Sequence, residues 1–257
     1  MKSTQNKIRP KLSILAVHGF TGDAFDFEPL FDHFDACWRF VNLPGHHHGF
    51  TEPIPIEGEW AQFKDRVTSV VDELNEKPDP VVVIAYSMGA RLLVRTCLEE
   101  KLRLEHAILI GFNPGIRDER ERAERLEHDS ALAAKLRSEG IEKFIDKWMD
   151  QPIIRSQQGK GAEVRIARKK QLLAEPLAAS LEYFSNGRLT PVDEEFSKIA
   201  SEITLISGEQ DHKFGAIHRA LADQHANVVC LKVPESGHAP NIENPRLFSE
   251  LLEELLN

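Results

Sequence analysis

The stretch of sequence that decides the fold is VVVIAYSMGAR, residues 81–91. Its first four residues, Val81–Ile84, are β-branched and apolar and predict a buried strand, whereas Met88–Glu100 predicts a helix. Ser87 stands at the corner between them, and small neighbours there let a strand and a helix approach closely. A serine at such a corner is displayed for chemistry. The alternative is an ordinary strand–helix turn that contains a serine, and the other loops decide between the two.

Composition excludes several classes of function. The chain has 257 residues, 41% hydrophobic and 28% charged, which suits a globular protein with one large domain or a core carrying an insertion. A net charge of −9 argues against nucleic-acid binding, because a phosphate backbone would be repelled. Three scattered cysteines favour buried thiols over disulfides or zinc. Neither a secretory signal nor a membrane span is visible, so we expect a cytoplasmic protein of unknown oligomeric state.

Apolar runs typical of buried strands alternate with helical patterns along the chain. We expect strands at residues 12–17, 38–43, 81–84, 107–110, 203–206 and 228–233, and helices at 24–34, 59–74, 88–100, 216–224 and 245–256. This alternation predicts an α/β fold with a mostly parallel sheet that is covered by helices on both faces. Only about eleven residues precede the first strand, too few for an antiparallel hairpin, so we expect that edge of the sheet to be trimmed.

The middle of the chain has a different texture. From residue 116 to about 195 it is rich in charge, with helical patterns and no convincing strand. We therefore expect residues 1–115 and 196–257 to form the α/β core and residues 116–195 to form an all-helical lid over it.

Two further loops supply the partners that a reactive serine needs. A serine hydroxyl is a poor nucleophile or base unless a histidine takes its proton and a carboxylate orients that histidine. Asp211 follows one predicted strand and His238 follows another, so both should lie at the same sheet edge as Ser87. Singly, Asp211 would be a helix cap and His238 a surface histidine. Together, in the order Ser–Asp–His, they predict the catalytic triad of an α/β-hydrolase fold.

Backbone groups near Ser87 predict an oxyanion hole. The N–H of Phe20, in the loop HGFTG at residues 18–22, and the N–H of Met88, which opens the helix after Ser87, could converge on one oxygen. The alternative is that this loop only shapes a turn. The run His46–His48 resembles a metal-ligand set, but adjacent histidines converge poorly on one ion. We expect this run to be a loop at the rim of the site, with no metal and no cofactor.

Arginine residues indicate the charge of the substrate. The segment RDERERAER, residues 117–125, alternates in sign, which is typical of a solvated helix with i,i+4 ion pairs. Nevertheless, Arg91 lies one turn into the helix after Ser87, and together with Arg165 and Arg168 it could face the site. Guanidinium groups bind carboxylates in a bidentate manner. A basic pocket in an acidic protein would therefore indicate a small anionic substrate.

At this point the chain resembles the bacterial 2-succinyl-6-hydroxy-2,4-cyclohexadiene-1-carboxylate synthases of menaquinone biosynthesis, which have the α/β-hydrolase fold. The resemblance runs from the first strand to the last helix. It rests on the motifs HGFTGD (18–23), LPGH (43–46), YSMG with Arg91 (86–91), RAER (122–125), Trp148 with QP (148–152), GEQDHKF (208–214), GH (237–238) and ENP (243–245). The lid motifs and GEQDHKF are more particular to this family than the motifs that all such hydrolases share.

The resemblance implies a lyase. The substrate would be a cyclohexene carboxylate bearing succinyl and enolpyruvyl groups, from which Ser87, activated by His238 and Asp211, would remove a proton while pyruvate leaves. The substrate-binding positions of the family fall on Arg91, Arg125, Arg168, Tyr86 and Trp148. Two alternatives stay open. One is a serine carboxylesterase or C–C bond hydrolase with the same triad, and the other is a ligand-binding protein on this fold that has lost its chemistry.

Overall fold

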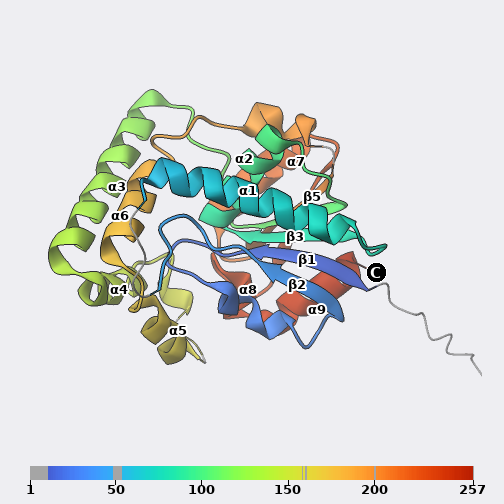
Figure 1. Ribbon diagram of the computed structural model, residues 1–257, viewed down its shortest axis with the longest axis horizontal. Helices are drawn as coiled ribbons and strands as arrows, with labels where there is room; N and C mark the ends of the chain where they lie inside the picture. The colour runs from blue at the N-terminus through green and yellow to red at the C-terminus, as the bar shows by residue number, and fades with distance from the viewer. Residues whose placement is uncertain (1–10, 49–53, 158, 160, 200, 257) are drawn as a thin grey trace, which may run out of the picture.

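A computed structural model describes residues 11–48, 54–157, 159, 161–199 and 201–256. Its centre is a six-stranded sheet in the order β2-β1-β3-β4-β5-β6, and each neighbouring pair is parallel (Figure 1). The strands are β1 (Leu12–Val17), β2 (Ala36–Phe40), β3 (Val81–Tyr86), β4 (His106–Ile110), β5 (Glu202–Gly208) and β6 (Val228–Val233). The predicted fold class is thus confirmed. The expected trimming of the edge before β1 concerns residues 1–10, which lie outside the described residues.

Helices cover both faces of the sheet, which is why β1, β3 and β4 are buried along their whole length. One face packs against α1 (Ile56–Asn75), α2 (Met88–Glu100) and α7 (His212–Gln224), and the other against α8 (Pro240–Glu243), α9 (Pro245–Leu255) and the 3₁₀-helix η1 (Ala24–Leu30). Figure 1 shows α1 on one side of the strands and α8 and α9 on the other. Two separate apolar layers result, one on each face of the sheet.

Several element boundaries differ from the sequence-based expectations. The helix expected at residues 24–34 is the shorter 3₁₀-helix η1, and Pro29 inside it lacks the N–H that a continuing α-helix would use. Its predicted N-cap is present, because the Asp23 side chain accepts from the Phe25 N–H at 2.9 Å. Strand β2 begins at Ala36 and ends at Phe40, earlier than expected. Helix α7 begins at His212 because the carboxylate of Asp211 caps it.

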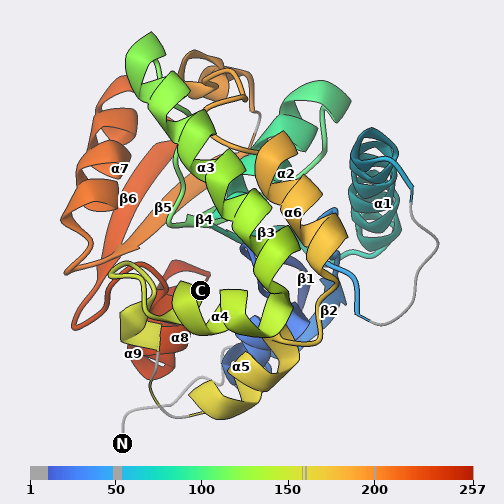
Figure 2. The ribbon, with the colours of Figure 1, turned by 90° about the vertical axis from the view of Figure 1, so that its left-hand side faces the viewer.

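The segment between β4 and β5 is helical wherever it is described as regular structure. It contains α3 (Glu119–Glu139), α4 (Ile141–Met149), α5 (Ala162–Lys169) and α6 (Ala174–Tyr183), with short 3₁₀ turns η2 (Arg155–Gln157) and η3 (Asp193–Lys198). Figure 2 shows α3 and α6 packed side by side over the core. An apolar cluster of their own holds these helices together. The division into a core and a lid at residues 116 and 195 stays a prediction, and η3 crosses its second boundary.

Helix composition also bears on membrane association. None of the helices formed by the described residues is long and apolar enough to cross a membrane.

Candidate active site

Ser87 occupies a strained corner between β3 and α2. Its backbone has φ 51° and ψ −110°, a region that residues other than glycine rarely adopt. The Ser87 N–H donates to the carbonyl of Ile110 on the neighbouring strand at 2.8 Å, which helps to hold this conformation. A Cβ at Gly89 would lie 2.2 Å from the His18 carbonyl oxygen, so the helix can approach β1 only with glycine there. Strain of this kind clusters at functional sites and is maintained by surrounding contacts.

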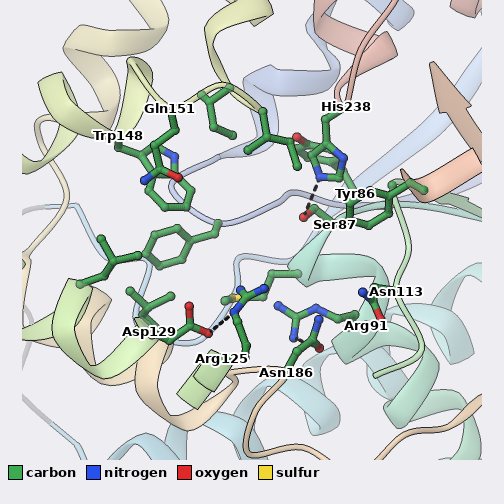
Figure 3. A pocket seen from close by; sticks show the side chains of 18 of the residues that line it. Tyr86, Ser87, Arg91, Asn113, Arg125, Asp129, Trp148, Gln151, Asn186 and His238 are labelled. Atoms are coloured by element: carbon green, nitrogen blue, oxygen red, sulfur yellow. Dashed lines mark hydrogen bonds and ion pairs between the residues drawn. The ribbon is translucent and has the colours of Figure 1, made fainter. Parts of the chain in front are cut away.

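The three residues of the predicted triad meet at one edge of the sheet. His238 Nε2 lies 3.4 Å from Ser87 Oγ (Figure 3). On the other side of the ring, His238 Nδ1 lies 2.8 Å from Asp211 Oδ2. The other carboxylate oxygen of Asp211 accepts from the Phe214 N–H at 3.2 Å. Asp211 is therefore both a helix cap and the partner of His238. A long Ser–His contact is common without substrate, and the arrangement suits proton transfer from Ser87 to His238.

The charge of Asp211 follows from its contacts. Burial alone would raise the pKa of this carboxyl. Hydrogen bonds from His238 and from the Phe214 N–H outweigh that effect, so the net pKa lies below the ordinary value. Asp211 is therefore ionised at neutral pH. An ionised Asp211 holds the Nδ1 proton of His238 and leaves Nε2 able to accept a proton from Ser87.

A carboxylate that sequence reasoning did not single out holds the loop around His238. Glu243 Oε2 accepts from the Gly237 N–H at 2.6 Å, and Glu243 Oε1 accepts from the Ala239 N–H at 2.9 Å. Both backbone neighbours of His238 are thus fixed by one side chain. The motif ENP at residues 243–245 carried the signal, but only the fold shows what its glutamate contacts.

A pocket of about 210 Å³ opens in front of Ser87 between the sheet edge and the helices of residues 116–195. Phe20 and Met88, whose backbone N–H groups are the predicted oxyanion hole, both line it. So do Tyr86 and Trp148, as the sequence predicts. Burial raises the pKa of Tyr86 well above its usual value, so its phenol stays neutral, and it accepts from Gln157 Nε2 at 3.3 Å.

Arg91 brings a buried positive charge to the pocket. Its Nη1 donates to the Phe184 carbonyl at 2.9 Å and to Asn186 Oδ1 at 2.6 Å, and both acceptors are uncharged. Among the described residues, no carboxylate forms an ion pair with it, and the side chain is only 9% exposed. Burial, with Arg125 nearby, lowers the pKa of Arg91 to about 9, which still leaves it protonated at neutral pH. A charge buried in this way attracts an anion.

Arg125 lines the same pocket from helix α3. Its Nε lies 2.8 Å from Oδ2 of Asp129, one turn further along the helix, and the Asp129 side chain is almost completely buried. Figure 3 shows this pair near Arg91, below Ser87 in that view. Asp129 engages the Nε edge of the guanidinium. Among the described residues, no hydrogen bond or ion pair engages the two terminal nitrogens of Arg125, so they can make a bidentate contact with a ligand carboxylate.

Arg168 lies elsewhere, and the expectation that it joins the other two arginines in the pocket is not met. Its Nη2 donates to Asp23 Oδ1 at 3.0 Å, its Nε lies 2.9 Å from Asp23 Oδ2, and the guanidinium covers the ring of Phe25. Arg168 is not among the residues that line the pocket. The reason is that α5 packs against the loop after β1, where Asp23 provides a carboxylate.

The histidine run at residues 46–48 is a structural loop. His46 is buried, its Nδ1 lies 2.9 Å from the Pro44 carbonyl, and its Nε2 accepts from the Thr21 N–H at 3.1 Å. His47 pairs with the buried Glu59, and His48 forms a β-bridge with Leu172. Within the part of the chain that the structure describes, no group of three or more His, Cys, Asp or Glu side chains is placed to hold a metal ion.

Comparison with known families assigns the class of protein. The family model described as "Alpha/beta hydrolase family" matches residues 14–251, and the chain therefore belongs to this family.

Similar proteins narrow the assignment. The 2-succinyl-6-hydroxy-2,4-cyclohexadiene-1-carboxylate synthase of Salmonella typhimurium is 29% identical over 250 residues, covering 95% of this chain and 93% of the relative. The enzyme of the same name from Salmonella paratyphi C is 29% identical over 245 residues. The resemblance to these synthases is confirmed, and so is the prediction of an enzyme of this fold.

Solved structures show the same fold. The structure of MenH from S. aureus superposes with a TM-score of 0.84 at 22% identity, covering 97% of this chain and 95% of that one. A thermophilic esterase from Thermogutta terrifontis, solved with malate bound, gives a TM-score of 0.71 at 18% identity over 96% of this chain and 90% of the esterase.

Proposed function

We propose that this protein is a 2-succinyl-6-hydroxy-2,4-cyclohexadiene-1-carboxylate synthase, a lyase of menaquinone biosynthesis that eliminates pyruvate. The observation that carries the proposal is Arg91, a buried guanidinium bound only to neutral oxygens among the described residues, which lines the same pocket as Ser87. An anionic substrate would supply the missing negative charge. The name of the curated relatives, which align over 95% of the chain, supports the same conclusion. We also propose that the protein is cytoplasmic.

The reaction needs a base and a site for negative charge. Ser87, whose proton passes to His238, takes a proton from a ring carbon of the cyclohexene. The electron pair of that C–H bond forms a new ring double bond, and the bond from the ring to the enolpyruvyl oxygen breaks. The leaving enolate then takes the proton that His238 received and becomes pyruvate, while the ring proton restores the Ser87 hydroxyl. Asp211 holds the histidine in place while it carries the positive charge.

Backbone and side-chain hydrogen-bond donors stabilise the negative charges of the substrate. The N–H groups of Phe20 and Met88 stabilise the negative charge that develops as the proton leaves. Arg91 and Arg125 bind carboxylates, and Tyr86 and Trp148 form walls of the pocket. Arg168 has no part in this proposal because Asp23 engages its guanidinium.

A serine carboxylesterase or a C–C bond hydrolase is the second candidate. The Ser87–His238–Asp211 arrangement supports it, because the same arrangement hydrolyses esters in this fold. An esterase for neutral acyl groups would have no use for Arg91 and Arg125 at the pocket wall, which places this candidate second. A protein that only binds ligands would not need the strained Ser87 or its histidine, so the third hypothesis ranks last.

The Ser87→Ala variant tests the proposal. Pyruvate release from the enolpyruvyl substrate is followed with the wild-type protein and with the variant. We expect the variant to lose the activity by about a thousandfold or more, since the base is removed. Release at the wild-type rate from Ser87→Ala would overturn the assignment of Ser87 as the base.

A further inference from the structure

Thr21, in the loop after β1, has an unusual backbone. Its φ is 62°, in the left-handed region that a β-branched residue rarely enters, and its side chain is buried. The hydroxyl of Thr21 makes no hydrogen bond within the described residues. A conformation of this kind persists only where surrounding contacts maintain it. Thr21 directly follows Phe20, so contacts that fix Thr21 also fix the place of the loop that carries the Phe20 N–H.

Two side chains hold the Thr21 backbone, one at its N–H and one at its carbonyl. The N–H donates to His46 Nε2 at 3.1 Å. The carbonyl oxygen accepts from Lys169 Nζ at 3.0 Å, and Lys169 is only 7% exposed. Buried hydrogen bonds of this type are costly to lose because the groups left behind cannot reach water.

His46 is set up as an acceptor. Its Nδ1 faces the Pro44 carbonyl at 2.9 Å and must therefore carry the proton, so the lone pair of Nε2 faces Thr21. Burial, followed by the nearby His18, lowers the pKa of His46 well below its usual value, and the ring is neutral. Its ring also lies edge-on to Phe20, with centroids 5.6 Å apart. The histidine thus contacts both residues of the loop.

Lys169 comes from a different part of the fold. It ends helix α5, and its neighbour Arg168 pairs with Asp23 two residues beyond Thr21. Arg168 and Lys169, which are consecutive residues of α5, therefore both bind the loop after β1. Figure 2 shows α5 at the lower edge of the helical segment.

We propose that His46 and Lys169 are positioning residues. Their hydrogen bonds to the Thr21 backbone, called the clamp below, hold the loop after β1 in place and thereby keep the Phe20 N–H in front of Ser87. The inference rests on the oxyanion hole of the proposed function. Helix α5 is then part of the catalytic apparatus without touching the substrate. Without these two hydrogen bonds, the Gly22 N–H would still donate to the Gly19 carbonyl and close the turn, but the loop could shift relative to Ser87.

The Lys169→Met variant tests the clamp, because it removes the donor and keeps most of the buried stem. We expect kcat for pyruvate release to fall about tenfold or more, with KM nearly unchanged, since the groups that bind carboxylates lie on other helices. Lys170→Met is the matched control. Lys170 is the next residue, pairs with the exposed Asp146, and should be replaceable without a change in kcat.

Lys169→Arg separates positioning from general stability. Arginine keeps a charged donor on a long stem, so it can still donate to the Thr21 carbonyl. We expect Lys169→Arg to retain more of kcat than Lys169→Met does. If Lys169→Arg loses as much kcat as Lys169→Met, activity does not depend on a donor to Thr21 and the inference is wrong.

Phosphonylation of Ser87 by a p-nitrophenyl phosphonate distinguishes failure of the clamp from failure of the proposed function. This reaction uses the oxyanion hole whatever the natural substrate is. If the wild-type protein releases no pyruvate, the proposed function fails, and slower phosphonylation of Lys169→Met still supports the clamp. If Lys169→Met reacts at the wild-type rate in phosphonylation, the clamp inference is wrong.

Discussion

Nη1 of Arg91 lies 2.6 Å from Oδ1 of Asn186, and both side chains are buried in the wall of the pocket that contains Ser87. A neutral amide orients the guanidinium without cancelling its charge. We therefore expect Arg91→Gln to raise KM for the carboxylate substrate by about tenfold to a hundredfold. The melting temperature should change little, because the buried charge that is removed lacks an ionic partner among the described residues.

Arg95→Gln is the matched control for Arg91. Arg95 lies one turn along the same helix, donates to the Thr190 carbonyl, and does not line the pocket. Its replacement should leave KM unchanged. Steady-state kinetics of both variants check the prediction, and an unaltered KM in Arg91→Gln would speak against an anion at this position.

Arg125 provides a second contact from helix α3. We expect Arg125→Gln to raise KM by about tenfold, with a smaller effect on kcat, because it removes a donor for a carboxylate and leaves the triad in place. Arg120→Gln, on the same helix, removes a side chain that is 88% exposed and should have no effect. Equal KM values for the two variants would exclude Arg125 from substrate binding.

Glu243 should affect turnover and not binding. An amide at this position offers one acceptor oxygen to two backbone N–H groups, those of Gly237 and Ala239. We expect Glu243→Gln to lower kcat several-fold, roughly three to tenfold, while KM stays the same. Glu250→Gln, an exposed residue of α9 that pairs with Arg246, is the control. An increase in KM with an unchanged kcat would contradict this role.

Stability should fall in mild acid because of four buried histidines, His18, His46, His106 and His218. Burial lowers the pKa of each below 6.5, and that of His218 to about 4. Below pH 6.5 the unfolded chain binds protons that the native protein does not, so the free energy of unfolding decreases as the pH falls. The expected slope is about 1.4 kcal/mol per pH unit for each histidine that stays neutral.

Urea unfolding between pH 7.5 and 5 measures this slope. His218→Gln should flatten it, whereas His212→Gln should not, because His212 is exposed. The lowered pKa of Asp211 adds nothing in this window, since that carboxyl is ionised in both states here. A free energy of unfolding that is constant between pH 7 and pH 5 would show that the four histidines are not buried as neutral groups.

Residues placed by local pattern were predictable from the sequence. Ser87, Asp211 and His238 each follow a strand of a parallel sheet, so chain order alone brings them to one edge. Arg91 was predictable from its distance along the helix after Ser87. The strands were predictable because a strand that is covered by helices on both faces is apolar at every position, which gives a short continuous apolar run in the sequence.

Contacts between distant segments could not be predicted. Arg168 was expected in the pocket because the sequence predicts only a series of helices between β4 and β5. Which way α5 faces depends on its packing against the loop after β1. Lys169 and Thr21 are 148 residues apart, and nothing in either stretch indicates the other. Pro29 indicates that a regular α-helix does not continue through η1, but the helical spacing of the apolar residues at 24–34 led to the prediction of a longer helix.

The central claim is that Ser87, beside the buried Arg91 and the partly exposed Arg125, eliminates pyruvate from a polycarboxylate. The most direct test compares kcat/KM of the wild-type protein for pyruvate release from the succinyl- and enolpyruvyl-bearing cyclohexene carboxylate with kcat/KM for hydrolysis of an uncharged aryl ester. We predict pyruvate release well above the spontaneous rate, with kcat/KM at least about a hundredfold higher than for the ester. Turnover of the ester with no pyruvate above the spontaneous rate would contradict the account and assign the protein as an esterase.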